Sequence, residues 1–235
     1  MNATMLRTSI LAAAMLASLS LSGTSAGAVD QVNDRAAICC ARATRLDPPT
    51  PPRTVQTTGL IGDSLSVGLT DDRFQVGPPI QELIASGGRS MWTSTSIGFN
   101  LADGLDVLVR RADVVSDTDV VVVALGTNDI VGGVARDSWR RAIDGIVRQV
   151  ERASPDAIVV WVDLSAPRFG NAAAEFNAIL LESAAREPSL AVCGWASNAA
   201  ANPQWLGSDG LHLTGTGYAA RRDVIVACID DVGFD

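Results

Sequence analysis

The chain has very little of two residue types that carry much of enzyme chemistry. Its 235 residues include one histidine, His212, and no lysine, so every basic side chain is an arginine. One imidazole leaves one place for histidine-assisted chemistry near neutral pH. The four cysteines show no CxxC spacing, and His212 has a better use than metal binding, so a metal site is not expected.

Long apolar runs are also missing, apart from one short segment at the start. Met1–Arg7 has one positive charge, Ile10–Leu21 is apolar, and Ala26-Gly27-Ala28 has the A-x-A form of a cleavage site. These features predict a signal peptide over residues 1–28. An uncleaved anchor is the alternative, but the apolar run is short for a membrane span. No cysteine follows it directly, which argues against a lipoprotein anchor, and we expect a secreted or cell-envelope-associated protein without stable membrane insertion.

Positive charge is scarce in the predicted mature chain. Removing Arg7 from 18 basic residues leaves 17 against 26 acidic ones, a net charge of −9. Such a surface repels phosphate backbones, so nucleic acid is not expected as a partner. The 207 residues left (235 minus 28) suffice for one domain. We expect an arm over residues 29–53, which is extended at its Pro-rich end, and a single folded domain over residues 54–235. We expect the protein to be a monomer.

The cysteines all lie beyond the predicted signal peptide. An even number in an exported chain favours disulfides, with three possible connectivities. A bridge between the adjacent Cys39 and Cys40 would be strained. We therefore expect this pair to bridge to Cys193 and Cys228, which would attach the arm to the domain. Free buried thiols are the alternative.

Apolar runs and helical patterns alternate along the domain. This order predicts βαβ units, and the continuous Val and Ile runs indicate strands that are buried on both faces. We expect an α/β fold, a three-layer αβα sandwich with about five parallel strands. Helices are expected over Leu101–Ala112 and around Tyr218–Ile229. Two more are expected between them: one has Asp137 as its N-cap and ends just before Pro155, and the other begins near Asn171 and ends before Pro188. The expected strands are Val55–Ile61, Ile80–Ala85, Asp119–Leu125, Ala157–Leu164 and Leu190–Cys193.

Three special segments follow the first three expected strands. They are Ser64, Gly87-Gly88 and Gly126-Thr127-Asn128-Asp129. The carboxyl ends of parallel strands meet at one edge of the sheet, where ligands bind in such folds. We therefore expect these segments to lie together.

The residues at this edge suit nucleophilic catalysis. A serine hydroxyl needs a base, His212 is the only imidazole, and Asp209 is placed to fix its tautomer. An oxyanion could accept hydrogen bonds from the N–H groups of Ser64 and Gly87 or Gly88 and from the Asn128 amide. Taken singly, these residues could equally be a helix N-cap, a surface histidine and ordinary turn residues. Asp63 and Asp129 are given no catalytic role, and no side chain besides His212 is expected to titrate near neutrality at the site.

The same segments resemble the blocks of the SGNH (GDSL-type) hydrolase superfamily. They are Gly62-Asp63-Ser64-Leu65, Gly87, Gly126-Thr127-Asn128-Asp129 and Asp209-Gly210-Leu211-His212, and a GxSxG elbow is absent. The resemblance, to an exported bacterial member, implies a flavodoxin-like fold. It also implies Ser64 as nucleophile, Asp209 and His212 as its partners, and Gly87 and Asn128 in the oxyanion hole. The second block carries two glycines, and Gly87 is our choice.

The sequence thus favours an exported serine esterase that hydrolyses small acyl esters through an acyl-enzyme on Ser64, without a cofactor. O-acetyl groups on glycans are a candidate substrate. The alternatives are an acyltransferase that acylates a glycan hydroxyl and, less favoured, a non-catalytic wall-associated binding module. The absence of an apolar lid argues against a long-chain triglyceride lipase. Trp92, Trp195 and Trp205 could stack on sugars, although packing is favoured, and Arg89 and Arg168 are either anion contacts or solvated side chains.

Overall fold

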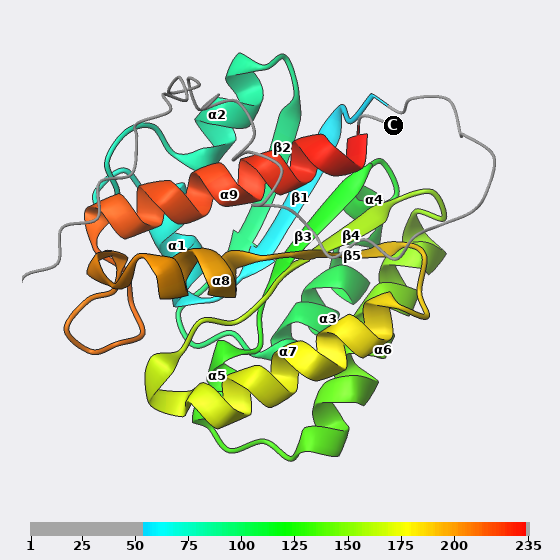
Figure 1. Cartoon of the computed structure of the whole chain (residues 1–235). Coiled ribbons are helices and arrows are strands. Elements are labelled where there is room, and N and C mark those ends of the chain that lie inside the picture. The colour runs from blue at the N-terminus through cyan, green and yellow to red at the C-terminus, as the bar shows by residue number, and fades with distance from the viewer. Residues whose placement is uncertain (1–53, 234–235) are drawn as a thin grey trace, which may run out of the picture. The chain divides into compact units, whose positions relative to one another are not determined.

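The computed structural model describes residues 54–233, which form one parallel sheet with helices on both faces (Figure 1). The strand order is β2-β1-β3-β4-β5, which is the flavodoxin-like order of doubly wound folds. The predicted three-layer α/β fold with five parallel strands is confirmed. The strands are β1 (Thr57–Gly62), β2 (Ser90–Thr95), β3 (Val120–Ala124), β4 (Ile158–Val162) and β5 (Leu190–Cys193).

Helices cover the two faces of the sheet in separate groups. In Figure 1, α1, α2, α8 and α9 lie on one face, and α3, α5, α6 and α7 lie on the other. Two short 3-10 segments, η2 (Pro167–Phe169) and η3 (Pro203–Trp205), complete the described elements. The helices are α1 (Ser64–Thr70), α2 (Ile80–Ser86), α3 (Leu101–Arg110), α4 (Ala112–Val115), α5 (Thr127–Val131), α6 (Arg136–Ala153), α7 (Gly170–Ala184), α8 (Trp195–Ala201) and α9 (Gly215–Gly233). None of these helices is long and apolar enough to cross a membrane.

The apolar core has two halves, one on each face of the sheet. In the central strand β3, Val121 and Val123 pack with α3, α6 and α7, whereas Val120 and Val122 pack with the α1 and α9 side. Successive side chains of a strand point to opposite faces, so a strand that is covered on both faces needs an unbroken apolar run. This explains why β3 and β4 could be predicted from sequence.

The second expected strand is wrong. Ile80–Ala85 lies in helix α2, and its buried side chains are Ile80 and Ile84, which are four residues apart on one helix face. The second strand in the chain is instead β2, whose residues are half-buried or exposed. β2 lies at the edge of the sheet beside β1, so its Ser- and Thr-rich sequence needs no apolar run.

Helix boundaries differ from the predictions by a few residues. The expected helix Leu101–Ala112 is divided, because α3 ends at Arg110 and α4 begins at Ala112. The N-cap of α6 is Ala135, so Asp137 lies in the first turn rather than at the cap. Asn171 lies just inside α7, which begins at Gly170.

The expected cysteine pairing is also wrong. Cys193 at the end of β5 is bonded to Cys228 on α9, with 5.8 Å between their Cα atoms. Both cysteines are fully buried in the same half of the core, where α9 packs against β4 and β5. Cys39 and Cys40 lie outside the described residues, as do the predicted signal peptide and arm.

Candidate active site

Ser64 lies at the carboxyl edge of the sheet, in the turn between β1 and α1. Asp63 caps α1 from an extended conformation, and its carboxylate accepts a hydrogen bond from the N–H of Leu65 at 2.9 Å. A Cβ on Gly62 would lie 2.0 Å from the Ser66 hydroxyl. Glycine therefore permits the tight turn that makes Ser64 the first residue of the helix.

The structure brings Ser64, His212 and Asp209 together from opposite ends of the domain. Ser64 Oγ is 3.0 Å from His212 Nε2, and His212 Nδ1 is 2.7 Å from Asp209 Oδ2. With the proton on Nδ1, the imidazole donates to Asp209 and Nε2 can accept the Ser64 hydroxyl proton. The arrangement is a hydroxyl, imidazole and carboxylate relay in which each contact has hydrogen-bond length.

The loop that carries Asp209 and His212 is fixed by its own backbone. Asp209 Oδ1 accepts from the N–H groups of Leu211 at 3.0 Å and His212 at 2.9 Å. Gly210 has a φ of +67°, which favours glycine, and the Gly207 N–H donates to the His212 carbonyl at 2.7 Å. These contacts hold the carboxylate and imidazole in one short turn.

The relay is open to solvent on one side. The side chains of Asp209 and His212 are 47% and 45% exposed. The hydrogen bond from His212, followed by that from the Leu211 N–H, lowers the pKa of Asp209 to about 2. Asp209 is therefore ionised at any pH at which the imidazole could act as a base.

Gly87, our choice for the oxyanion hole, lies at the amino ends of the strands, opposite the carboxyl ends where Ser64 lies. It caps the C-terminus of α2, and its N–H already donates to the Ile84 carbonyl at 3.2 Å. Ser90, the first residue of β2, pairs with Thr57, the first residue of β1. Gly87 and Gly88 are thus separated from Ser64 by the length of β1, roughly 20 Å at about 3.3 Å per residue. The prediction is wrong because it placed these glycines after a strand, whereas they precede one.

A different glycine, Gly98, follows β2 at the edge where Ser64 lies. Thr95 pairs with Gly62, and the next residue, Ser96, donates its N–H to the Gly62 carbonyl at 3.1 Å. Gly98 has a φ of +86°, and no atom would lie within 4 Å of a Cβ there. Its N–H donates to no acceptor in the part of the chain that the structure describes. The signal that could have revealed this strand is the run Ser90–Thr95, which contains two threonines and a tryptophan, residue types that favour strands.

Asn128 lies beside the Gly98 loop. Its side-chain Nδ2 donates to the Phe99 carbonyl at 2.7 Å. An amide nitrogen carries two hydrogens, so one remains to donate to a substrate oxygen. Gly126 before it has a φ of +121°, and a Cβ there would lie 2.5 Å from the Phe176 ring. The sharp turn after β3 thus needs glycine and directs Asn128 towards the loop after β2.

Two buried aspartates lie near the relay. Asp63 is 1% exposed, and burial raises the pKa of its carboxyl group. Asp129 is also buried, and burial raises its pKa to about 6, although its Oδ2 accepts from the Leu101 N–H at 3.1 Å. Burial thus brings the pKa of Asp129 closer to neutrality than the sequence led us to expect. Within residues 54–233, no group of three His, Cys, Asp or Glu side chains could hold a metal ion.

The tryptophans form no sugar platform. Trp195 is fully buried, and Trp205 stacks on it with ring centroids 5.9 Å apart. Trp92 lies on β2 against Gly59, and its ring N–H donates to Thr118. The packing interpretation is therefore the one that agrees with the structure.

The two candidate arginines lie in different places. Arg89 forms an ion pair with Asp230 on α9, away from the relay. Arg168 lies along Gly210 in the loop that carries Asp209 and His212, and its Nη1 is 3.4 Å from the Asp209 carbonyl oxygen. Of the two, only Arg168 borders the candidate site.

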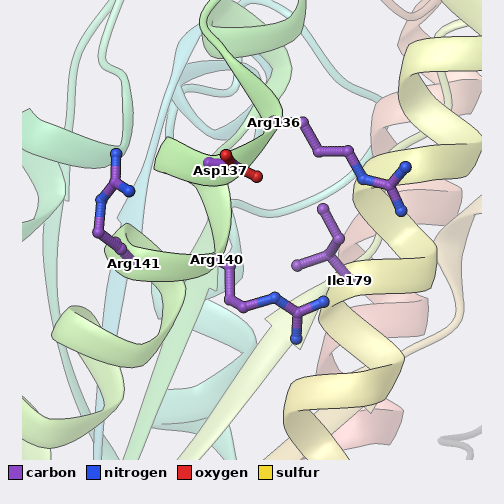
Figure 2. Close-up of a pocket in the computed structure, with 5 residues that line it drawn as sticks. All are labelled: Arg136, Asp137, Arg140, Arg141 and Ile179. Atoms are coloured by element: carbon purple, nitrogen blue, oxygen red, sulfur yellow. The ribbon is translucent and has the colours of Figure 1, made fainter.

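A separate pocket lies between α6 and α7 (Figure 2). Arg136 and Arg140 extend towards α7 and Ile179, whereas Arg141 points away from them. Arg140 forms an ion pair with Glu182 on α7. None of Ser64, Asp209 and His212 lines this pocket, so we assign it no part in the chemistry of the relay.

The fold and the relay together define an α/β protein with the side chains that acyl transfer requires. Residues 60–220 match the GDSL-like lipase/acylhydrolase family. The chain belongs to this family, and the resemblance to SGNH hydrolases drawn from sequence is confirmed.

Known relatives and solved structures agree with this assignment. The O-acetyltransferase OatA of Staphylococcus aureus is 25% identical over 171 residues, which cover 73% of this chain and 24% of that protein. The chain thus spans about a quarter of the length of this relative. The structure of TesA is similar with a TM-score of 0.59 and 20% identity, covering 73% of this chain and 95% of that one. The C-terminal catalytic domain of Streptococcus pneumoniae peptidoglycan O-acetyltransferase A, with a methylsulfonyl adduct, gives a TM-score of 0.57 and 15% identity, covering 76% and 94%.

Proposed function

We propose that this protein is a serine esterase that hydrolyses small acyl esters through an acyl-enzyme on Ser64. The observation that carries the proposal is the continuous relay from Ser64 Oγ through His212 to Asp209, with contacts of 3.0 and 2.7 Å. Membership of a family of lipases and acylhydrolases supports the same reaction class.

In the first half-reaction, Ser64 Oγ attacks the ester carbonyl carbon while its proton passes to His212 Nε2. The ionised Asp209 stabilises the imidazolium that forms. The oxyanion accepts hydrogen bonds from the N–H groups of Ser64 and Gly98 and from the Asn128 amide, with Gly98 in the role first given to Gly87. Collapse of the tetrahedral intermediate breaks the carbon–oxygen bond, and His212 returns its proton to the departing alcohol.

Water completes the cycle. His212 takes a proton from the water as it attacks the acyl carbon, and the second tetrahedral intermediate expels Ser64, which regains that proton. The products are the free acid and the regenerated serine. No step needs a cofactor or metal.

For the substrate class, we propose O-acetyl groups on glycans. Two similar proteins are named O-acetyltransferases, one of them for peptidoglycan. The solvent-exposed flank of the relay suits an ester that projects from a large molecule. The predicted signal peptide, together with a disulfide, supports a secreted or envelope location, since disulfides persist in oxidising compartments. We propose a monomer.

An acyltransferase is the second candidate, because the same relay could pass the acyl group to a sugar hydroxyl instead of water. The names of the two relatives favour this option specifically. Supplying a glycan acceptor together with an acetyl ester distinguishes the two activities. A hydrolase releases acetate in proportion to the ester consumed, whereas a transferase diverts the acetyl group to the acceptor.

The test of the proposal is covalent labelling with a fluorophosphonate probe, followed by peptide mass spectrometry. Wild type should take up one probe per chain on Ser64, and Ser64→Ala should lose labelling and lose esterase turnover by on the order of a thousandfold or more. Ser66→Ala is a matched control on the same helix, because the buried Ser66 hydroxyl has no hydrogen-bond partner to lose. Wild-type turnover in a folded Ser64→Ala protein would overturn the proposal.

A further inference from the structure

One short loop carries the proposed oxyanion donor Gly98 and leads into a helix. It runs from Ser96, directly after β2, to Leu101, the first residue of α3. At its near end, the N–H of Ser96 donates to the Gly62 carbonyl at the end of β1. A backbone N–H stabilises an oxyanion only if it is aimed at that oxygen in advance. The contacts that hold the far end of the loop therefore bear on the chemistry proposed for Ser64.

Asp129 contacts the far end of this loop through a buried hydrogen bond. Its Oδ2 accepts from the N–H of Leu101 at 3.1 Å, and Asp129 and Leu101 are 5% and 2% exposed. Because both partners are buried, loss of the carboxylate would leave the N–H without an acceptor. The contact joins α5, which carries Asp129, to α3 on the same face of the sheet (Figure 1).

The N–H that Asp129 accepts is left over from the local cap of α3. The first N–H groups of a helix have no acceptor within the helix. In α3 the Asn100 side chain accepts from the N–H groups of Ala102 at 2.9 Å and Asp103 at 3.1 Å, as part of a capping box. The Leu101 N–H lies before these two, and its acceptor comes from another element. Asp129 thus fixes where α3 begins relative to α5.

Asn128, the neighbour of Asp129, holds the same segment on the other side of Asn100. Its Nδ2 donates to the Phe99 carbonyl at 2.7 Å. Two adjacent side chains of α5 therefore hold two adjacent peptide groups of the loop, one as donor and one as acceptor. Gly98 directly precedes this segment, and no atom lies within 4 Å of its Cβ position. The direction of its N–H is therefore set by the residues that flank it.

We propose that Asp129 is a positioning residue for the oxyanion hole. By holding the first N–H of α3, it fixes the loop that presents the Gly98 N–H beside Asn128, at the edge of the sheet where Ser64 lies. Asp129 acts through the backbone of this loop and is no member of the proton relay. The inference rests on the proposed function, since it assumes that an oxyanion forms beside Ser64. Misplacing a group by about 1 Å can lower a rate by about a hundredfold.

The experiment compares Asp129→Ala with Asp129→Asn, because asparagine retains an oxygen that can accept from the Leu101 N–H and alanine does not. The measurements are kcat and KM on a chromogenic acetyl ester and the rate of fluorophosphonate labelling of Ser64. We expect Asp129→Ala to lower kcat and the labelling rate by about tenfold or more, with KM changed by less than about threefold, since the oxyanion develops only in the transition state. Asp129→Asn should recover most of the rate.

Two comparisons separate positioning from a loss of stability. Asp119→Ala is the matched control, because the Asp119 carboxylate also accepts from backbone N–H groups, those of Gln56 and Thr57 at 2.9 Å, but at the amino end of β1. It should lower the melting temperature and leave kcat unchanged. The second comparison uses the thionoester analogue of the substrate, whose sulfur accepts hydrogen bonds more weakly than oxygen. Asp129→Ala should lose more of its rate on the ester than on the thionoester, whereas a general loss of stability lowers both rates equally.

A double-mutant cycle with Gly98→Ala completes the test. If Asp129 acts through the Gly98 loop, the double variant should be no slower than the slower single variant. Additive losses, equal losses on ester and thionoester, or a folded Asp129→Ala enzyme with wild-type kcat would overturn the inference. Should Asp129→Ala fail to fold, Asp129→Glu replaces it, since one more methylene displaces the carboxylate from the Leu101 N–H, and wild-type kcat and labelling rate there would overturn it equally. A wild type that labels elsewhere than Ser64 would instead refute the proposed function.

Discussion

The disulfide between β5 and α9 should make a large contribution to stability. It joins residues 35 positions apart and closes a loop that contains α8, η3, Asp209 and His212. In the chain-entropy account, cross-linking a loop of this length restricts the unfolded chain by about 13 cal/mol/K, or about 4 kcal/mol at 25 °C. Total stabilities are about 5–15 kcal/mol, so the bond accounts for a substantial part of the total.

The perturbation is the double variant Cys193→Ala/Cys228→Ala. We expect its free energy of unfolding to fall by about 4 kcal/mol in urea titrations, and its melting temperature to fall by about 8–16 °C for a domain of this size. At 25 °C the variant should stay folded and keep kcat within about threefold, because the relay is also held by the hydrogen bonds of its own turn. Activity should then be lost at a lower temperature than in the wild type.

Cys39→Ala/Cys40→Ala is the matched control, because the bond in the structure uses neither residue. Its urea midpoint should equal that of the wild type. Peptide mapping without reduction should recover the segment of Cys193 linked to that of Cys228. An unchanged urea midpoint in Cys193→Ala/Cys228→Ala, or a peptide that links Cys193 to Cys39 or Cys40, would refute the reasoning.

Three further predictions concern the edge of the sheet around Ser64. Gly98→Ala should lower kcat by about tenfold or more, because a side chain at φ +86° strains the backbone and turns its N–H. Gly87→Ala, at φ −84°, is the control and should leave kcat unchanged. Equal effects of the two variants on steady-state turnover would contradict the assignment of Gly98 as an oxyanion donor. Asn128→Ala should lower kcat by about a hundredfold to a thousandfold with KM little changed, and a change in KM alone would make Asn128 a binding residue. Burial raises the pKa of the Asp129 carboxyl from 3.8 to about 6, so this group contributes stability that is present below pH 3.8 and lost as the pH rises through 6. Asparagine cannot ionise, so the free energy of unfolding of Asp129→Asn minus that of the wild type should be larger at pH 8 than at pH 4, by on the order of 2–3 kcal/mol. Urea unfolding at the two pH values checks this, and a difference that does not depend on pH would show that Asp129 is not held protonated.

The parts of the fold that sequence could predict are those in which burial dictates residue type. β3 and β4 need apolar side chains on both faces, and their valine runs reveal them. Cysteine pairing gave no such local signal. Cys193 and Cys228 meet because α9 packs against β4 and β5, and that packing is a property of the whole domain.

The error over the oxyanion glycine followed from the error over one strand. An edge strand needs few apolar residues, so β2 was overlooked and the apolar run of α2 was taken in its place. The carboxyl end of a strand determines which loop reaches the site, and the misassignment moved the expected donor from Gly98 to Gly87, which lies at the opposite end of β2. Ser64, Asp209 and His212 escaped this error for a physical reason. Ser64 follows a strand that is buried on both faces, and Asp209 and His212 are coupled by a three-residue turn whose geometry is local, so neither depends on the assignment of β2.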